Sequence, residues 1–286
     1  MLRRLTVPQA FAISAVLAML LAAGAVWQFD ATPGDMARAL GPSLIGIAAV
    51  FWVLWRKVSP APEGAHLPPR PLTTDFAPLH PDQRYGDLTG LPLKSIEYVV
   101  VDTETTGLKT ETDDIVQIGA VRIVDGRLLE GDSFERLVNP GRPIPPQSIR
   151  FHGVTDDMVA HAPPITEVLQ EFLDYAGDAV LIGHNIAFDL AFMNRTKRVP
   201  NAAIDTMLLS IGAFPNRRRH TLDDLAETFE EPIRDRHSAL GDADLTARVF
   251  LRLIPSLGRV GVLSFGDAQA MCEDAATRIR AQRPYG

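Results

Sequence analysis

Cysteine and an excess of positive charge are what this sequence most clearly lacks. Its 286 residues include one cysteine, Cys272, which excludes an intrachain disulfide and any zinc module built from several cysteines. Its 28 basic residues are outnumbered by 35 acidic ones, which gives a formal net charge of −7. A protein that grips long duplex nucleic acid needs a broad surface of lysine and arginine, so the charge argues against that class. A site that meets phosphates through bound cations remains compatible with it.

Long uncharged runs are present, and both lie near the N-terminus. Residues 10–27 carry no charge, and residues 44–55 are apolar at all but one position. With their flanks they predict two transmembrane helices, at about residues 8–29 and 36–55, which together form a membrane anchor of residues 1–57.

Basic residues flank this pair of apolar runs. Arg3 and Arg4 precede the first run, and Arg56 and Lys57 follow the second. The positive-inside rule then places both chain ends in the cytoplasm, on a multi-pass protein of the bacterial inner membrane whose two helices form a hairpin. Two alternatives stay open. The first run is also compatible with a signal peptide cleaved near residues 23–25, and both runs with buried core helices.

Proline separates this region from the rest of the chain. Residues 58–94 hold eight of the 22 prolines and little apolar periodicity, which is typical of an extended linker. A globular domain is expected over residues 95–256. Residues 257–286 form a tail, in which apolar spacing indicates a helix over 266–280.

The pattern of residues 95–256 predicts an α/β domain with a mixed sheet, because three consecutive strands precede alternating helices and strands. Asp125-Gly126 joins two of the strands and is a strong hairpin signal. The expected strands are 96–101, 115–124, 127–138, 179–182 and 202–204, and the expected helices are 165–175, 186–196, 206–211, 221–229 and 238–254.

Acidic residues stand where these buried strands end or helices begin. Asp102 and Glu104 follow the first strand, and residues two apart in extended chain face the same side. Asp189 and Asp242 each lie near the start of a helix, and His237 precedes Asp242 by five residues. Taken singly, each is also compatible with an ordinary polar strand end or helix start.

Together these residues suit one chemistry. Two divalent cations about 3.5–4 Å apart can clamp the attacking and leaving oxygens of a phosphodiester. Hard cations such as Mg²⁺ prefer carboxylate oxygens, so no cysteine is needed. A neutral imidazole can take the proton from the attacking water because its pKa lies near the operating pH.

Three segments then resemble a known family. Residues 101–108 (VDTETTGL), 184–189 (HNIAFD) and 237–242 (HSALGD) are similar to the three exonuclease motifs of the DEDDh superfamily, which includes the epsilon proofreading subunit of bacterial DNA polymerase III. The resemblance covers roughly residues 95–254, and three motifs in order are far more specific than any one of them.

The resemblance implies a ribonuclease H-like fold with a five-stranded mixed sheet flanked by helices, and 3′→5′ hydrolysis that releases nucleoside 5′-monophosphates. It makes His237 the general base and assigns two Mg²⁺ or Mn²⁺ ions to Asp102, Glu104, Asp189 and Asp242. The residues that it implies for substrate binding are Thr105, Thr106, Gly107, Leu108, His152, Asn185 and Phe188.

The expected partner is the 3′ end of single-stranded or frayed nucleic acid, with DNA favoured. Residues 95–256 carry 26 acidic and 16 basic side chains, a net charge of −10, so recognition is expected to concentrate at the 3′ end. The arginines of residues 217–219 are equally compatible with phosphate contact and with a solvated loop. RNA-end trimming and a non-catalytic binding or scaffold role remain alternatives. A polymerase partner is compatible with the family, but no segment of the sequence indicates one.

Overall fold

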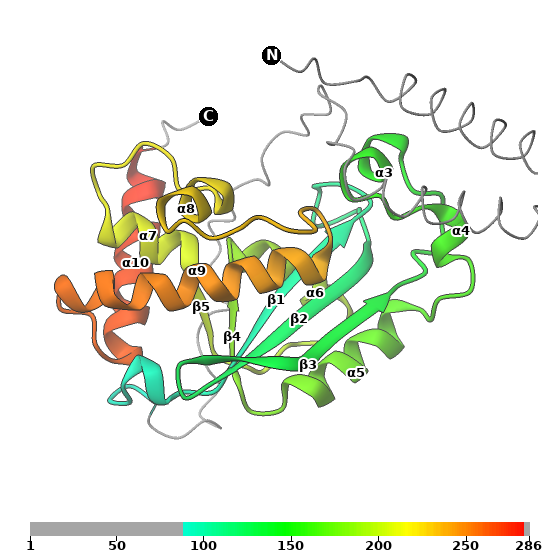
Figure 1. Ribbon diagram of the computed structural model, residues 1–286. Coiled ribbons are helices and arrows are strands. Elements are labelled where there is room, and N and C mark those ends of the chain that lie inside the picture. Colours follow the sequence, from blue (N-terminus) through cyan, green and yellow to red (C-terminus); the bar gives the residue numbers. More distant parts are fainter. Residues whose placement is uncertain (1–87, 283–286) are drawn as a thin grey trace, which may run out of the picture. The chain divides into compact units, whose positions relative to one another are not determined.

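The computed structural model describes residues 88–282 (Figure 1). Both apolar runs and nearly all of the proline-rich segment lie outside the described residues. Within residues 88–282, no helix combines the length and the apolar character that a membrane crossing requires.

A five-stranded mixed sheet organises the domain, in the order β3-β2-β1-β4-β5. The central strand β1 (Tyr98–Thr105) pairs antiparallel with β2 (Ile115–Val124) and parallel with β4 (Val180–Gly183). The edges are β3 (Arg127–Leu137), antiparallel to β2, and β5 (Ala203–Asp205), parallel to β4. The mixed sheet that the sequence predicts is confirmed.

The turn between β2 and β3 is the Asp-Gly hairpin that the sequence indicates. Asp125 has a φ of 50° and Gly126 a φ of 69°. Two successive residues of positive φ match the twist of the flanking strands, which is why this dipeptide is favoured in such turns.

The strand β1 is longer than predicted. The sequence places its end at Val101, because carboxylates rarely continue a buried strand, and this boundary is wrong. Pairing with β2 continues through Asp102 and Glu104, up to a register shift between Glu104 and Thr105. The two acids therefore lie within the sheet, where backbone hydrogen bonds fix their direction.

Helices cover both faces of the sheet (Figure 1). The long helix α9 (Ala239–Arg259) crosses one face over β1, β2 and β3, while α5 (Ile165–Ala176) and α6 (Ile186–Thr196) cover the other. Beside β5, α7 (Thr206–Ala213) packs on α10 (Phe265–Gln282). The remaining helices are η3 (Leu93–Ser95), α3 (Pro146–His152), α4 (Asp156–Val159) and α8 (Leu222–Thr228), which packs on α9.

Two of these short helices, α3 and α4, are absent from the elements that the sequence predicts. Pro146 occupies the first turn of α3, and Gly153 ends that helix with a φ of 76°. Proline at a helix start and glycine just past its end are favourable, but the preceding prolines conceal the signal. A small apolar cluster that includes Val116 of β2 and Val154 anchors the segment.

The last two helices extend the core past residue 256, where the sequence places the end of the domain. The sequence predicts an end of the first of them at Ile254, yet α9 continues through Pro255 to Arg259. Proline inside a helix costs about 3 kcal/mol, and burial of Leu253 and Leu257 offsets that cost. The helix expected in the tail is present as α10, and it buries Phe265, Ala268, Cys272, Ala275 and Ala276.

Candidate active site

The end of β1 and the first turn of α9 bring three carboxylates together. Asp102 and Glu104 project from β1, and Asp242 from α9. Each offers an oxygen within 4.8 Å of the others, and their exposed fractions are 5%, 3% and 4%. Buried carboxylates at this separation repel each other and lose hydration, so a positive charge among them would stabilise their ionised forms.

Gly119 allows α9 to begin at this place. It pairs with Asp102 across the β-ladder, and a Cβ there would lie 2.2 Å from the backbone nitrogen of Leu240. The side chain of Gln117 accepts a hydrogen bond from the backbone nitrogen of Ala239 at 3.2 Å. The start of the helix thus rests directly on β2, beside the carboxylates of β1. Nothing in the sequence marks either residue as part of the site.

The fourth predicted acid, Asp189, lies on the first turn of α6 and is 1% exposed. Its Oδ1 accepts hydrogen bonds from the backbone nitrogen of Thr103 at 3.0 Å and from its hydroxyl at 2.6 Å. Since Thr103 stands between Asp102 and Glu104, Asp189 is tied to the same stretch of β1. Among the described residues, the three-carboxylate cluster does not include Asp189, which lies next to it.

Asp205 determines where α6 begins. It is fully buried, and its Oδ1 accepts hydrogen bonds from the backbone nitrogens of Asn185 at 3.1 Å and Met207 at 2.9 Å. Burial raises the pKa of Asp205 to about 6, against the lowering effect of these bonds. The first bond holds Asn185, which has a φ of 66°, at the start of α6.

His237, the predicted general base, is held from two sides. Its backbone nitrogen donates to Oδ1 of Asp242 at 3.3 Å, and its φ of 64° turns the chain sharply before α9. Its ring lies against that of Phe151 on α3, with centroids 4.1 Å apart and planes at 43°. The contact with Phe151 was not predicted, because α3 itself was not.

His152 stands beside this pair at the end of α3. Its pKa is lowered to about 4, mainly by burial; a hydrogen bond with the backbone of Thr105 opposes the shift, and nearby His237 adds to it. The Nδ1 atom accepts a hydrogen bond from the backbone nitrogen of Val154 at 3.0 Å. The ring is therefore neutral at pH 7 and carries its proton on Nε2.

Two arginines clamp the loop that follows β1. Arg142 donates to the hydroxyl of Thr106 at 2.9 Å and pairs with Asp114 at 2.8 Å. Arg195, at the end of α6, pairs with the same Asp114 at 2.7 Å. A Cβ on Gly107 would lie 2.4 Å from the carboxylate of Asp113. Glycine at this position therefore leaves room for the Asp113 side chain to pack against the loop.

The predicted substrate-binding residues lie at different depths. Thr105 and Thr106 are buried, Gly107 and Leu108 are partly exposed at the surface, and Phe188 is 1% exposed. The ring of Phe188 packs edge-on against Phe192 in the core, with centroids 5.1 Å apart. The structure thus places Phe188 in the core beneath the helix that carries Asp189, and it leaves the predicted substrate contacts untested.

The arginines near the site are engaged with protein groups. Arg236, directly before His237, pairs with Asp242. Arg217 donates to the carbonyl of Asp224 at 2.6 Å, and Arg219 pairs with the carboxylate of the same residue at 3.0 Å. Two of the three arginines of residues 217–219 thus brace the start of α8.

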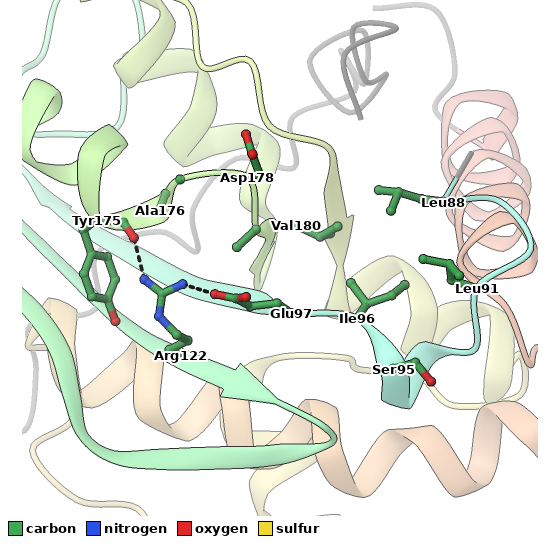
Figure 2. Close-up of a pocket in the computed structure, with 12 residues that line it drawn as sticks. Leu88, Leu91, Ser95, Ile96, Glu97, Arg122, Tyr175, Ala176, Asp178 and Val180 are labelled. Atoms are coloured by element: carbon green, nitrogen blue, oxygen red, sulfur yellow. Dashed lines mark hydrogen bonds and ion pairs between the residues drawn. The ribbon is translucent and has the colours of Figure 1, made fainter. Parts of the chain in front are cut away.

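A hollow at the other end of β1 holds no comparable cluster (Figure 2). It is lined by the starts of β1 and β4 and the end of α5. Its arginine, Arg122, lies over the ring of Tyr175, donates to the carbonyl of that residue and pairs with Glu97 and Asp132. Because protein groups already satisfy this guanidinium, Arg122 is not free to bind an anionic ligand in the hollow.

Comparison with known proteins agrees with this site. The model of the RNase_T family, described as exonuclease, matches residues 99–250, more than half of the chain. The chain belongs to this exonuclease family. The fold and the DEDDh-type motifs that the sequence indicates are thereby confirmed.

The exonuclease region is similar to parts of larger proteins. It is 48% identical over 187 residues to a DNA polymerase III subunit epsilon-like protein of Rhodobacter capsulatus, a match that covers 63% of this chain and 27% of the relative. It is 38% identical over 194 residues to a PolC-type DNA polymerase III of Caldanaerobacter subterraneus subsp. tengcongensis. That match covers 66% of this chain and 14% of the relative. The chain thus matches about a quarter or less of the length of these curated relatives.

Solved structures share the fold. Exonuclease X in complex with 5′ overhanging duplex DNA superposes with a TM-score of 0.51 at 28% identity, over 61% of this chain and 99% of that one. The nuclease domain of 3′hExo, a DEDDh family member bound to rAMP, gives a TM-score of 0.50 at 22% identity, over 59% of this chain and 95% of that one.

Proposed function

We propose that this protein is a metal-dependent 3′→5′ exonuclease that acts on single-stranded nucleic acid, with DNA favoured, and releases nucleoside 5′-monophosphates. The observation that carries the proposal is the convergence of Asp102, Glu104 and Asp242 within 4.8 Å in a buried position. Buried carboxylates without cysteine or a histidine cluster fit Mg²⁺ or Mn²⁺, which prefer oxygen ligands. Asp189, tied to Thr103 beside them, would complete the ligand set.

Two bound divalent ions would supply the charge that stabilises the attacking and leaving oxygens of the scissile phosphodiester. His237 would take the proton from the attacking water, and its contacts with Phe151 and Asp242 hold the imidazole for that step. His152, neutral at pH 7, would stand beside His237 on the substrate side of the site. The segment from Thr105 to Leu108, with Asn185, would bind the terminal nucleotide, whereas Phe188 packs in the core behind it.

The preference for DNA is supported by the relatives. Two of them carry the names of DNA polymerase III proteins, and the structure of Exonuclease X holds duplex DNA with a 5′ overhang. The net charge of −10 over residues 95–256 opposes binding along a long strand, so recognition would concentrate on the 3′ end.

The direct test is nucleotide release by the full chain. Single-stranded DNA labelled at either end, frayed duplex DNA and short RNA are incubated with Mg²⁺ or with excess EDTA. We expect stepwise shortening from the 3′ end of DNA in Mg²⁺ and none in EDTA. Faster shortening of RNA would move the substrate to RNA ends. Undiminished release in EDTA would contradict the metal-dependent mechanism.

Isosteric variants separate chemistry from folding. Asp102→Asn and Asp189→Asn remove a charge at nearly constant shape and are expected to lower release by at least about a hundredfold, with circular dichroism unchanged. Glu171→Gln, on the outer surface of α5, is the matched control. A folded wild-type chain that binds DNA ends and releases no nucleotide would favour the scaffold alternative.

We also propose that residues 1–57 anchor the enzyme in the inner membrane with the exonuclease domain in the cytoplasm. The support is the two uncharged runs and the arginines and lysine that flank them. A cytoplasm-active reporter fused after Gly286 is expected to be active, and activity of a periplasm-specific reporter at the same place would reverse the topology.

A further inference from the structure

Arg236 places a positive charge on one of the candidate metal ligands. Its Nη1 pairs with Oδ2 of Asp242, while Nε reaches Oδ1 of Asp223 on α8 at 2.7 Å. The arginine side chain is 24% exposed, and that of Asp242 is 5% exposed. Burial lowers the pKa of Arg236, but attraction to Asp242 and Asp223 outweighs it and raises the pKa overall. The guanidinium is therefore permanently charged.

A guanidinium and a divalent cation compete for this carboxylate. Oδ1 of Asp242 accepts the backbone nitrogen of His237 at 3.3 Å, and Oδ2 faces Arg236. Arginine has donors only, so it cannot coordinate a metal ion, and its charge repels one at short range. A cation that binds Oδ2 of Asp242 must therefore displace Arg236 from that oxygen.

Asp223 provides the second position for Arg236. Its side chain is 53% exposed, and its two oxygens already lie 2.7 Å from Nε and 3.4 Å from Nη2 of Arg236. Rotation about the bond between Cδ and Nε would move Nη1 away from Asp242 while Nε stays beside Asp223.

We propose that Arg236 is a built-in counter-ion that competes with a divalent cation for Asp242, and that Asp223 is the residue that receives Arg236 when the cation binds. The pair would set the metal affinity of the site. Arg236 neutralises Asp242 before binding, and Asp223 lowers the cost of displacing it. This inference rests on the proposed metal-dependent function, since it concerns the same carboxylates.

The test is calorimetric titration of the full chain with Mn²⁺ in the absence of nucleic acid. Arg236→Met keeps most of the side-chain length but removes the charge, and it is expected to tighten Mn²⁺ binding about tenfold. Asp223→Asn leaves Arg236 with Asp242 as its remaining carboxylate and is expected to weaken Mn²⁺ binding about threefold. In the double variant the Asp223→Asn effect is expected to vanish, because the arginine that it acts through is gone.

The melting temperature is a second measurement, which distinguishes a change in metal binding from misfolding of a variant. Without metal, Arg236→Met is expected to lower the melting temperature, since the carboxylates then repel without a counter-charge, and Mn²⁺ should restore it. Arg278→Met and Asp274→Asn form the matched control, because these residues are an exposed ion pair on α10. Both are expected to leave Mn²⁺ affinity unchanged.

The outcomes separate the two proposals. Unchanged or weaker Mn²⁺ binding by folded Arg236→Met would overturn the counter-ion role, and an Asp223→Asn effect that persists in the double variant would overturn the role of Asp223. Absence of Mn²⁺ binding in the wild type and in Arg236→Met alike would contradict the metal-dependent function itself, and this inference with it.

Discussion

The imidazole of His237 lies against the phenyl ring of Phe151, and its backbone nitrogen bonds to Asp242. His152, which follows Phe151 as the last residue of α3, is kept neutral by burial. A base that must meet a water molecule works best when it is already oriented, because ordering a free side chain costs entropy. The ring contact thus makes Phe151 a positioning residue for His237.

Replacing Phe151 with alanine is expected to lower kcat about tenfold while KM changes little, because the freed imidazole spends less time in the productive orientation. Phe151→Leu keeps part of the contact and is expected to retain more of kcat. Steady-state kinetics on a labelled oligonucleotide measures both constants. A rise in KM with unchanged kcat would instead mean that Phe151 contacts the substrate.

The lowered pKa of His152 makes stability depend on pH. Below its ordinary pKa of 6.5 the unfolded state takes up a proton that the folded state refuses until about pH 4. The contribution is therefore complete above pH 6.5 and is lost as pH falls toward 4, by about 3 kcal/mol. His152→Gln is expected to flatten the fall in unfolding free energy across this window, measured by denaturant titration.

The exposed His161→Gln is the matched control for loss of a histidine. A His152→Gln curve that stays parallel to the wild type between pH 4 and 6.5 would show that burial does not keep His152 neutral.

At the scale of elements, the site depends on the contact between β2 and the first turn of α9. Gly119 lies opposite Asp102 in the ladder and leaves room for the backbone of Ala239 and Leu240. A strand and a helix approach this closely only where one side chain is missing. Asp242 reaches the carboxylates of β1 because this position is glycine.

Gly119→Ala is expected to displace the start of α9, since the new Cβ would meet backbone atoms at 2.2 Å that no rotamer change can relieve. We expect a loss of about 1–3 kcal/mol in unfolding free energy and weaker Mn²⁺ binding, measured by denaturant titration and calorimetry. Gly90→Ala, where nothing lies within 4 Å of the new Cβ, should change neither. Full Mn²⁺ affinity in Gly119→Ala would show that the helix start tolerates the shift.

At the scale of the domain, α10 is part of the core. It packs on α7 and β5, and the thiol of Cys272 lies 3.7 Å from the carbonyl oxygen of Asp205. Asp205 in turn fixes the start of α6, which carries Asp189. The C-terminal helix thus supports the site through two layers of contact.

The reactivity of the single cysteine measures whether α10 is packed in the core. Cys272 is 4% exposed, and burial raises the pKa of its thiol, so reaction with a thiol reagent requires α10 to open. In native buffer the full chain is expected to react slowly, and the rate should rise with denaturant in parallel with unfolding. Rapid stoichiometric labelling under native conditions would show that α10 is not held in the core.

Much of the fold follows from local pattern. The apolar runs of β1, β2 and β4, the Asp-Gly turn and the apolar spacing of α5 and α6 determine elements that depend on neighbours in the chain. The wrong boundaries occur where contacts between residues far apart in the sequence determine where an element ends. Pairing with β2 carries β1 past Val101, and core packing carries α9 through Pro255.

The candidate site also has one part that the sequence indicates and another that it does not. The sequence by itself indicated the proposed chemistry, since Asp102, Glu104, Asp189, Asp242 and His237 are the residue types that the proposed two-cation hydrolysis would use, placed at predicted strand ends and helix starts. Their chain positions span more than a hundred residues, so no local rule gives distances between them.

Only the tertiary structure decided which groups surround those carboxylates. Gly119 admits α9, Phe151 holds His237, and Arg236 pairs with Asp242. None of these roles leaves a periodic or compositional trace. Each is a contact between two elements, and its energy depends on separations of a few ångströms that exist only once the sheet and the helices have packed together.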